Sequence, residues 1–111
     1  MTDRELLEKA AKAAGYGKVE WMVGTFGVER PHVRFDDSWS WTHWNPLTDD
    51  GDALRLAVKL RIMLDQIDKG YMAGYVVAVS VESFYEKEEP DPYAATRRAI
   101  VRAAAAIGEK T

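Results

Sequence analysis

Three tryptophans and a histidine lie within six positions of one another in the segment SWSWTHW (38–44). In an extended chain, alternate side chains point to the same side, so Trp39, Trp41 and His43 would share one face and Trp44 the other. Exposed tryptophans form binding hot spots and stack on nucleic-acid bases, whereas most large aromatic residues are buried. Both interpretations stay open for Trp39 and Trp41. Trp44 precedes Asn-Pro-Leu and is expected to pack as the lead-in to a buried helix.

Arginines form a second candidate binding surface near the C-terminus, at Arg97, Arg98 and Arg102. All three lie on the polar side of a predicted helix. They are expected either to form a solvated face paired with Glu86, Glu88 and Glu89, or to contact a phosphate or an acidic protein.

Catalytic and metal-binding patterns are weak. His32 and His43 flank strand-like segments and, with Asp36 or Asp37 nearby, would form at most a minimal metal or general-base site. The acids Asp49, Asp50 and Asp52 lack the closing glutamate of a calcium-binding loop, and helix capping explains them. The chain has no cysteine, and its glycine pairs lack the lysine of a phosphate-binding loop. We therefore expect no catalytic residues, no metal and no cofactor.

The bulk composition is that of one globular domain over residues 1–111, with 47% hydrophobic and 30% charged residues. A net charge of -3 argues against general nucleic-acid binding. The N-terminus has early acids and no apolar run of signal-peptide type, and the apolar stretch 71–81 is too short to span a bilayer. These features predict a cytoplasmic protein.

Hydrophobic periodicity predicts three helices. The first begins at Thr2 or Asp3 and stops at Gly15, and its apolar face is Leu6, Leu7, Ala10, Ala11 and Ala14. The second is expected to end near Leu64 and to be the most buried, because Leu54 and Val58 widen its apolar arc. The last begins at Asp91 and Pro92, a strong start signal, and stops at Gly108.

Strands are predicted where apolar and polar residues alternate. The segments are 19–23, 32–35, an extended stretch at 39–43, and 71–85 as the clearest strand. Residues 63–67 are ambiguous between helix and strand. Together the elements predict an α+β single domain with three helices and a small, largely antiparallel sheet of about three to four strands.

Three blocks resemble the small bacteriophage proteins grouped as the phage ABA sandwich domain. They are TDRELLEKAAKAAG (2–15), WNPLTDDGDALRLAVKL (44–60) and DPYAATRRAIVRAAAAIGE (91–109), roughly half of the chain. The resemblance implies an α-β-α layered sandwich and a bacteriophage or prophage origin. The family carries no assigned activity, so no catalytic residue follows from it.

Two functions of different classes follow from these observations. The first is a small phage-encoded, non-catalytic interaction protein that binds and inhibits a host protein of a defence system or a regulator. The alternative is a binder that sequesters a nucleotide signal, with stacking on Trp39 or Trp41 and phosphate capture by the arginines. The alternative requires the two groups to converge on one pocket, within one copy or in a homo-oligomer.

Overall fold

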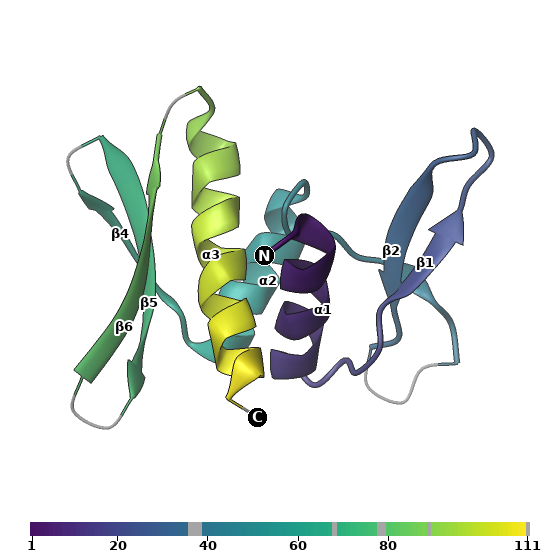
Figure 1. The fold of residues 1–111 in the computed structure, drawn as a ribbon, viewed down its shortest axis with the longest axis horizontal. Helices are drawn as coiled ribbons and strands as arrows, with labels where there is room; N and C mark the ends of the chain where they lie inside the picture. The colour runs from purple at the N-terminus through teal and green to yellow at the C-terminus, as the bar shows by residue number, and fades with distance from the viewer. Residues whose placement is uncertain (36–38, 68, 78–79, 89, 111) are drawn as a thin grey trace.

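Two small antiparallel sheets flank a layer of three helices in the computed structural model of this protein (Figure 1). The structure describes residues 1–35, 39–67, 69–77, 80–88 and 90–110. The elements, in chain order, are α1 (Asp3–Ala13), β1 (Glu20–Val23), β2 (Glu29–Val33), β3 (Thr42–His43), α2 (Asp50–Leu60), β4 (Met63–Ile67), β5 (Gly70–Val77), β6 (Ser80–Lys87) and α3 (Pro92–Glu109). One sheet has the order β1-β2-β3 and the other β4-β5-β6.

The α+β class, the three helices and the antiparallel pairing are confirmed. The Cα radius of gyration, 14.0 Å, is close to the ~13 Å expected of one compact domain of this size. The strands differ in grouping from the expectation, because they form two three-stranded sheets rather than one sheet of about three to four strands. The helices lie between these sheets, so the layers run sheet, helices, sheet (Figure 1).

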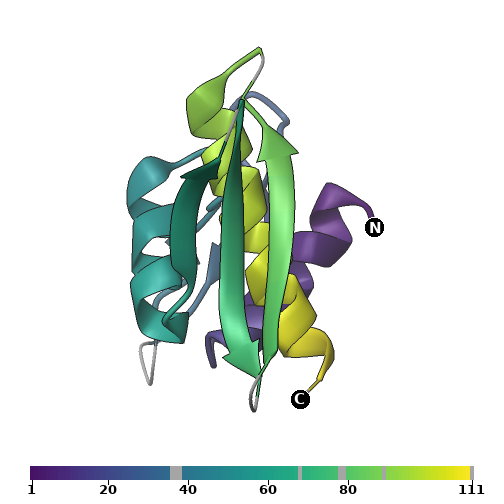
Figure 2. The same cartoon turned by 90° about the vertical axis from the view of Figure 1, so that its left-hand side faces the viewer.

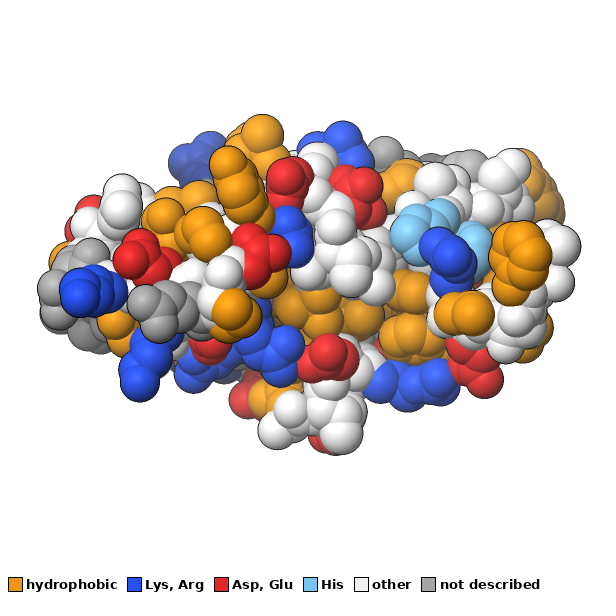
Figure 3. Space-filling view, turned by 90° about the horizontal axis from the view of Figure 1, so that it is seen from above, with side chains coloured by type: hydrophobic (Ala, Val, Ile, Leu, Met, Phe, Trp, Pro, Cys, Tyr) orange, Lys and Arg blue, Asp and Glu red, His pale blue; other side chains and the backbone are white. Residues whose placement is uncertain are grey.

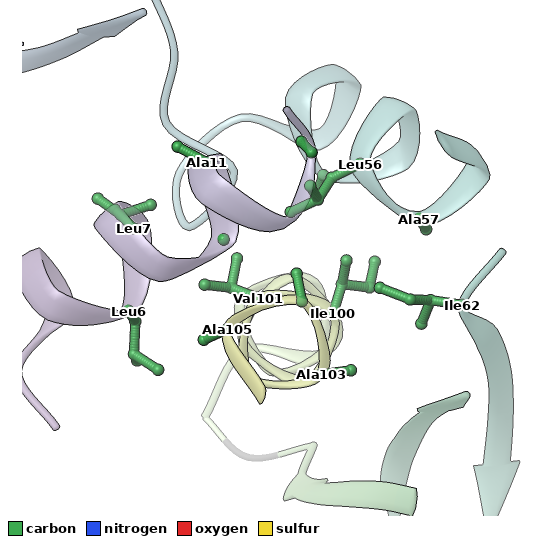
Figure 4. Packing of buried hydrophobic residues seen from close by; sticks show 14 of the residues in the cluster. Leu6, Leu7, Ala11, Leu56, Ala57, Ile62, Ile100, Val101, Ala103 and Ala105 are labelled. Carbon is green, nitrogen blue, oxygen red and sulfur yellow. The ribbon is translucent and has the colours of Figure 1, made fainter. Parts of the chain in front are cut away.

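Helix α3 is the centre of the core. It packs against α1, α2, β5 and β6 (Figure 2), and Figure 4 shows it end-on between side chains of the other two helices. Its buried face is made of small residues, and Ala99, Ala103 and Ala104 are completely inaccessible. Small side chains allow close backbone approach. At Gly108 a Cβ atom would lie 2.0 Å from the carbonyl oxygen of Lys9, so only glycine fits where α3 crosses α1.

The predicted helix starts are confirmed. The hydroxyl of Thr2 accepts from the backbone N–H of Glu5, whose carboxylate accepts in return from the N–H of Thr2. Asp49 accepts from the N–H of Asp52, and Asp91 accepts from the N–H of Tyr93.

Helix α2 differs from the prediction in length and in burial. It ends at Leu60, and Arg61 adopts the left-handed conformation (φ 55°) that ends many helices. The ambiguous residues that follow form strand β4 rather than the end of the helix. Leu54 and Val58 are 60% and 70% exposed, so the expectation that α2 is the most buried helix is wrong. Periodicity identified the apolar positions of α2, but it did not identify which of them are covered by another element of the fold.

The strand predicted over residues 71–85 is two strands, β5 and β6, which pair as a hairpin with Val77 opposite Ser80. Tyr85 of β6 also explains a glycine in β5. A Cβ atom at Gly70 would lie 2.4 Å from the Tyr85 ring, so the ring covers the backbone there.

The β1-β2-β3 sheet is anchored to the helices at one side only. Val19, Val33 and Trp44 belong to the core, whereas Val23 at the end of β1 is 66% exposed. The hairpin between β1 and β2 projects away from the helices (Figure 1). Of the segment predicted to be extended around Trp41, only Thr42 and His43 are strand.

Candidate functional site

The tryptophan segment divides into a buried end and an exposed end. Trp44 is 1% exposed, whereas Trp39 is 92% exposed. Trp41 is half-buried, and the guanidinium of Arg34 lies 4.7 Å from its ring centroid, a cation–π contact. The segment therefore places one tryptophan in the core, one against an arginine and one in solvent. Asp36 and Asp37, considered as partners for the histidines, lie outside the described residues, as does Ser38.

Trp44 joins the β1-β2-β3 sheet to the helical core. Its backbone N–H donates to the carbonyl of Pro31 at 3.0 Å, and its ring meets Tyr16 edge-on with centroids 5.7 Å apart. Directly after it, the N–H of Asn45 donates to the buried carboxylate of Asp52. The predicted role of Trp44 as the hydrophobic lead-in to α2 is confirmed.

The acids that follow have structural partners. The hydrogen bond between Asp52 and Arg55 raises the pKa of the Arg55 guanidinium above its usual value. Asp50 forms an ion pair with Arg97 on α3. At the first helix, the backbone and side-chain hydrogen bonds from Thr2 lower the pKa of Glu5 below its usual value. These two pKa shifts belong to helix starts rather than to the tryptophan segment.

His32 and His43 are direct partners across β2 and β3. Their rings meet edge-on with centroids 5.6 Å apart, and Nδ1 of His32 lies 2.9 Å from the carbonyl oxygen of Arg30. The sequence left open whether the two histidines lie close together, and the structure brings them together on neighbouring strands. Among the described residues, no third histidine, aspartate or glutamate completes a group of three with them.

A second exposed apolar feature lies at the tip of the β1–β2 hairpin. Phe26 is 91% exposed, and Val23 and Val28 beside it are 66% and 54% exposed. The turn is closed by the N–H of Gly27, which has a positive φ and donates to Gly24. Sequence reasoning considered the glycines of this stretch only as a phosphate-binding loop, which they do not form because the lysine is absent. The signal that it missed was an aromatic residue between two turn glycines.

The three candidate arginines of α3 are bound to acids of the chain itself. Arg97 is 15% exposed and donates to the Leu47 carbonyl at 2.9 Å and to Asp50 at 2.6 Å. Arg98 pairs with Asp3 of α1 at 2.8 Å. Arg102 pairs with Glu86, as the simpler interpretation expected, and donates to the carbonyl of Tyr85 at 3.0 Å. These arginines tie α3 to α1, β6 and the start of α2.

The arginines and the exposed tryptophan lie in different parts of the molecule. Helix α3 and the β1-β2-β3 sheet are on opposite sides of α1 (Figure 1). Arginines of α3 line pockets of about 330, 310 and 180 Å³, and none of these three contains a tryptophan. In the part of the chain that the structure describes, a single copy therefore does not bring these tryptophans and the α3 arginines into one of these pockets.

Comparisons of the chain with models of protein families, with curated proteins and with solved structures found no match. Within the described part of the chain, no helix has the length and apolar character needed to cross a membrane.

Proposed function

We propose that this chain is a non-catalytic protein-binding domain whose contact surface centres on Trp39. The observation that carries the proposal is the exposure of that side chain, 92%. Burying a large aromatic side chain on binding removes more apolar surface from water than any other single residue offers, which is why tryptophan is enriched in hot spots.

The surroundings of Trp39 support the same function. Trp41 and His43 follow it along the chain, and both remain accessible in part. Strand β3 lies at the edge of its sheet, so one side of its backbone has no neighbouring strand among the described residues. An edge strand beside an exposed aromatic side chain provides both backbone hydrogen bonds and an apolar anchor, a combination used in strand-addition binding.

The class of partner follows from the resemblance of the sequence to phage-encoded proteins. A phage protein of this kind acts inside an infected cell, so the partner proposed here is a host protein, and the consequence of binding is inhibition of that protein. Localisation in the host cytoplasm belongs to the same proposal.

The experiment compares wild-type protein with Trp39→Ala and with Leu54→Ala. Leu54 is an exposed apolar residue of α2 (60%), so its replacement controls for loss of a surface side chain elsewhere. Each protein is immobilised, host lysate is passed over it, and the retained protein is purified and titrated by calorimetry. Trp39→Ala is expected to weaken binding by about 30-fold or more, as for a hot-spot residue, and Leu54→Ala to leave it unchanged. Equal binding by wild type and Trp39→Ala would disprove the proposed surface.

The nucleotide-binding alternative makes a different prediction. It requires two copies of the chain to bring Trp39 or Trp41 of one copy to Arg97, Arg98 or Arg102 of the other. Titration with nucleoside phosphates, followed by tryptophan emission and by sedimentation, tests it. A saturating quench accompanied by dimer formation would favour this alternative over the protein-binding function.

A further inference from the structure

The pairing of His32 with His43 brings the only two imidazoles of the chain together on an accessible surface. His32 is half-buried and His43 is exposed. Figure 3 shows the two rings side by side at the surface of the β1-β2-β3 end of the molecule. The chain has no cysteine, so this pair contains every histidine or cysteine ligand that the chain can offer to Zn²⁺ and similar ions.

The hydrogen bond of His32 prepares this ring for coordination. Because a carbonyl oxygen can only accept, the contact between Nδ1 and the Arg30 carbonyl places the proton on Nδ1. Nε2 then carries a free lone pair. An imidazole whose other nitrogen donates to a backbone carbonyl is the usual arrangement of a metal-ligating histidine.

The separation of the rings fits a shared ion. With a metal–nitrogen distance of about 2.0–2.1 Å, two rings on one ion have centroids about 4.5–5.5 Å apart. The observed separation is 5.6 Å. His43 makes no hydrogen bond to another described residue through its ring, so a small rotation of this exposed side chain closes the difference. The paired strands hold the two Cα atoms opposite each other and supply the preorganisation.

From this geometry we infer that His32 and His43 form a two-imidazole site for a borderline transition-metal ion such as Zn²⁺, Ni²⁺ or Cu²⁺. Two protein ligands leave the remaining coordination positions to water or to a ligand from another molecule. A Lys or Arg side chain lies beside the rings (Figure 3), and no described carboxylate completes a three-ligand group. Ca²⁺ and Mg²⁺ need oxygen ligands, so we expect neither ion to bind at this site.

The test uses the free, full-length chain with ZnCl₂ and NiCl₂ as probes and with CaCl₂ and MgCl₂ as comparisons. Zn²⁺ titration is followed by calorimetry and by the ring-proton NMR signals of both histidines. One Zn²⁺ per chain and shifts of both rings are expected, with no response to Ca²⁺ or Mg²⁺. His43→Ala is expected to weaken Zn²⁺ binding by at least 30-fold. Thr42→Ala, at the adjacent exposed strand position, is the matched control and should bind as the wild type does.

Three outcomes would overturn the inference. They are the absence of binding at millimolar Zn²⁺, a shift of one ring only, and undiminished binding by His43→Ala. His43→Ala replaces an exposed side chain, and its melting temperature without metal establishes that it folds. Because no partner protein is present in this experiment, its result is independent of the proposed protein-binding function.

Discussion

Trp39 and Trp44 are five positions apart in the sequence, yet the first is 92% exposed and the second 1% exposed. The same residue type therefore has two different roles in one short segment. Trp44 fills the space between Tyr16 and the start of α2 and contributes to stability. Trp39 contributes its side chain to the surface and is available for binding.

Replacement of each tryptophan by alanine should separate these roles. Trp44→Ala is expected to lower the free energy of unfolding by about 3–5 kcal/mol, because it leaves a large cavity in the core. Trp39→Ala is expected to change it by no more than about 0.5 kcal/mol. Urea unfolding measures both values. Iodide should quench the emission that Trp39→Ala removes and leave the emission of Trp44 largely unaffected. A large loss of stability in Trp39→Ala would place that ring in the core instead.

The hydrogen bonds of Thr2 lower the pKa of Glu5, and this shift has a defined pH dependence. The folded protein favours the carboxylate, so the contribution to stability is complete above the ordinary pKa of 4.5 and is lost as the pH falls through the lower, folded value. Thr2→Ala keeps the backbone N–H that donates to Glu5 and removes the hydroxyl, so the Glu5 pKa should rise part of the way toward 4.5. Carboxyl ¹³C titration by NMR measures it, and Glu8, also an exposed acid of α1, serves as the internal reference. An unchanged Glu5 titration in Thr2→Ala would contradict the contribution assigned to the Thr2 hydroxyl.

At the scale of elements, the packing of α3 depends on the small size of the side chains on its buried face. Alanines and one glycine on its buried face allow α1 to approach the helix backbone, and ion pairs surround this contact. Lys9 pairs with Glu109 at 2.7 Å, and Arg98 pairs with Asp3 at 2.8 Å. Pairs this exposed contribute about 0–1 kcal/mol each, so close packing rather than charge holds the two helices together.

Gly108→Ala tests the close approach. In most helix positions alanine is more stabilising than glycine by about 1 kcal/mol. Here the new methyl group would lie 2.0 Å from the Lys9 carbonyl oxygen, and overpacking of this kind lowers stability by about 1–3 kcal/mol. Gly51→Ala is the matched control, because its Cβ atom would meet the end of the Arg55 side chain and the Asp49 carboxylate at 3.2 Å. Chemical unfolding should show that Gly108→Ala lowers the free energy of unfolding, and that Gly51→Ala raises it or lowers it clearly less. Equal stabilities would show that α1 and α3 separate easily.

At the scale of the whole molecule, the two sheets differ in how they attach to the helices. Strands β5 and β6 pack against α3 along their length, whereas β1, β2 and β3 pack mainly on one another. The connections of the latter include Trp44 and also Arg4 of α1. The Arg4 guanidinium lies 2.6 Å from the Glu29 carboxylate and 4.2 Å from the Trp21 ring centroid. The β1–β2 hairpin is therefore expected to be the less stable part of the fold.

Native-state hydrogen exchange should resolve this difference. Backbone amides of β1 and β2 are expected to exchange well before those of α3 and β5, because few buried contacts hold the hairpin. Arg4→Ala should accelerate exchange in the hairpin and leave α3 unchanged. Lys18→Ala is the control. It removes an ion pair with Glu20 of β1 that does not connect the hairpin to α1, so it should have no such effect. Uniform exchange over both sheets would show that the domain opens as one unit.

The sequence by itself determined the features that depend on neighbours along the chain. The cap at Asp91 and the apolar face of α1 were predicted, and Thr2 and Asp49 were among the candidate caps of the first two helices, because hydrogen bonds and helical periodicity operate over a few residues. The α+β class followed from the same local patterns. The resemblance to phage proteins and the function that it suggests remain predictions.

Only the tertiary structure decided which surfaces are covered. It exposed Trp39 and Leu54, divided the strands into two sheets, and gave each arginine of α3 an acidic partner from a distant segment. It also set His32 opposite His43, which the sequence raised only as one arrangement among others. Burial and pairing depend on segments far apart in the chain, and local patterns carry no information about which of those segments come together.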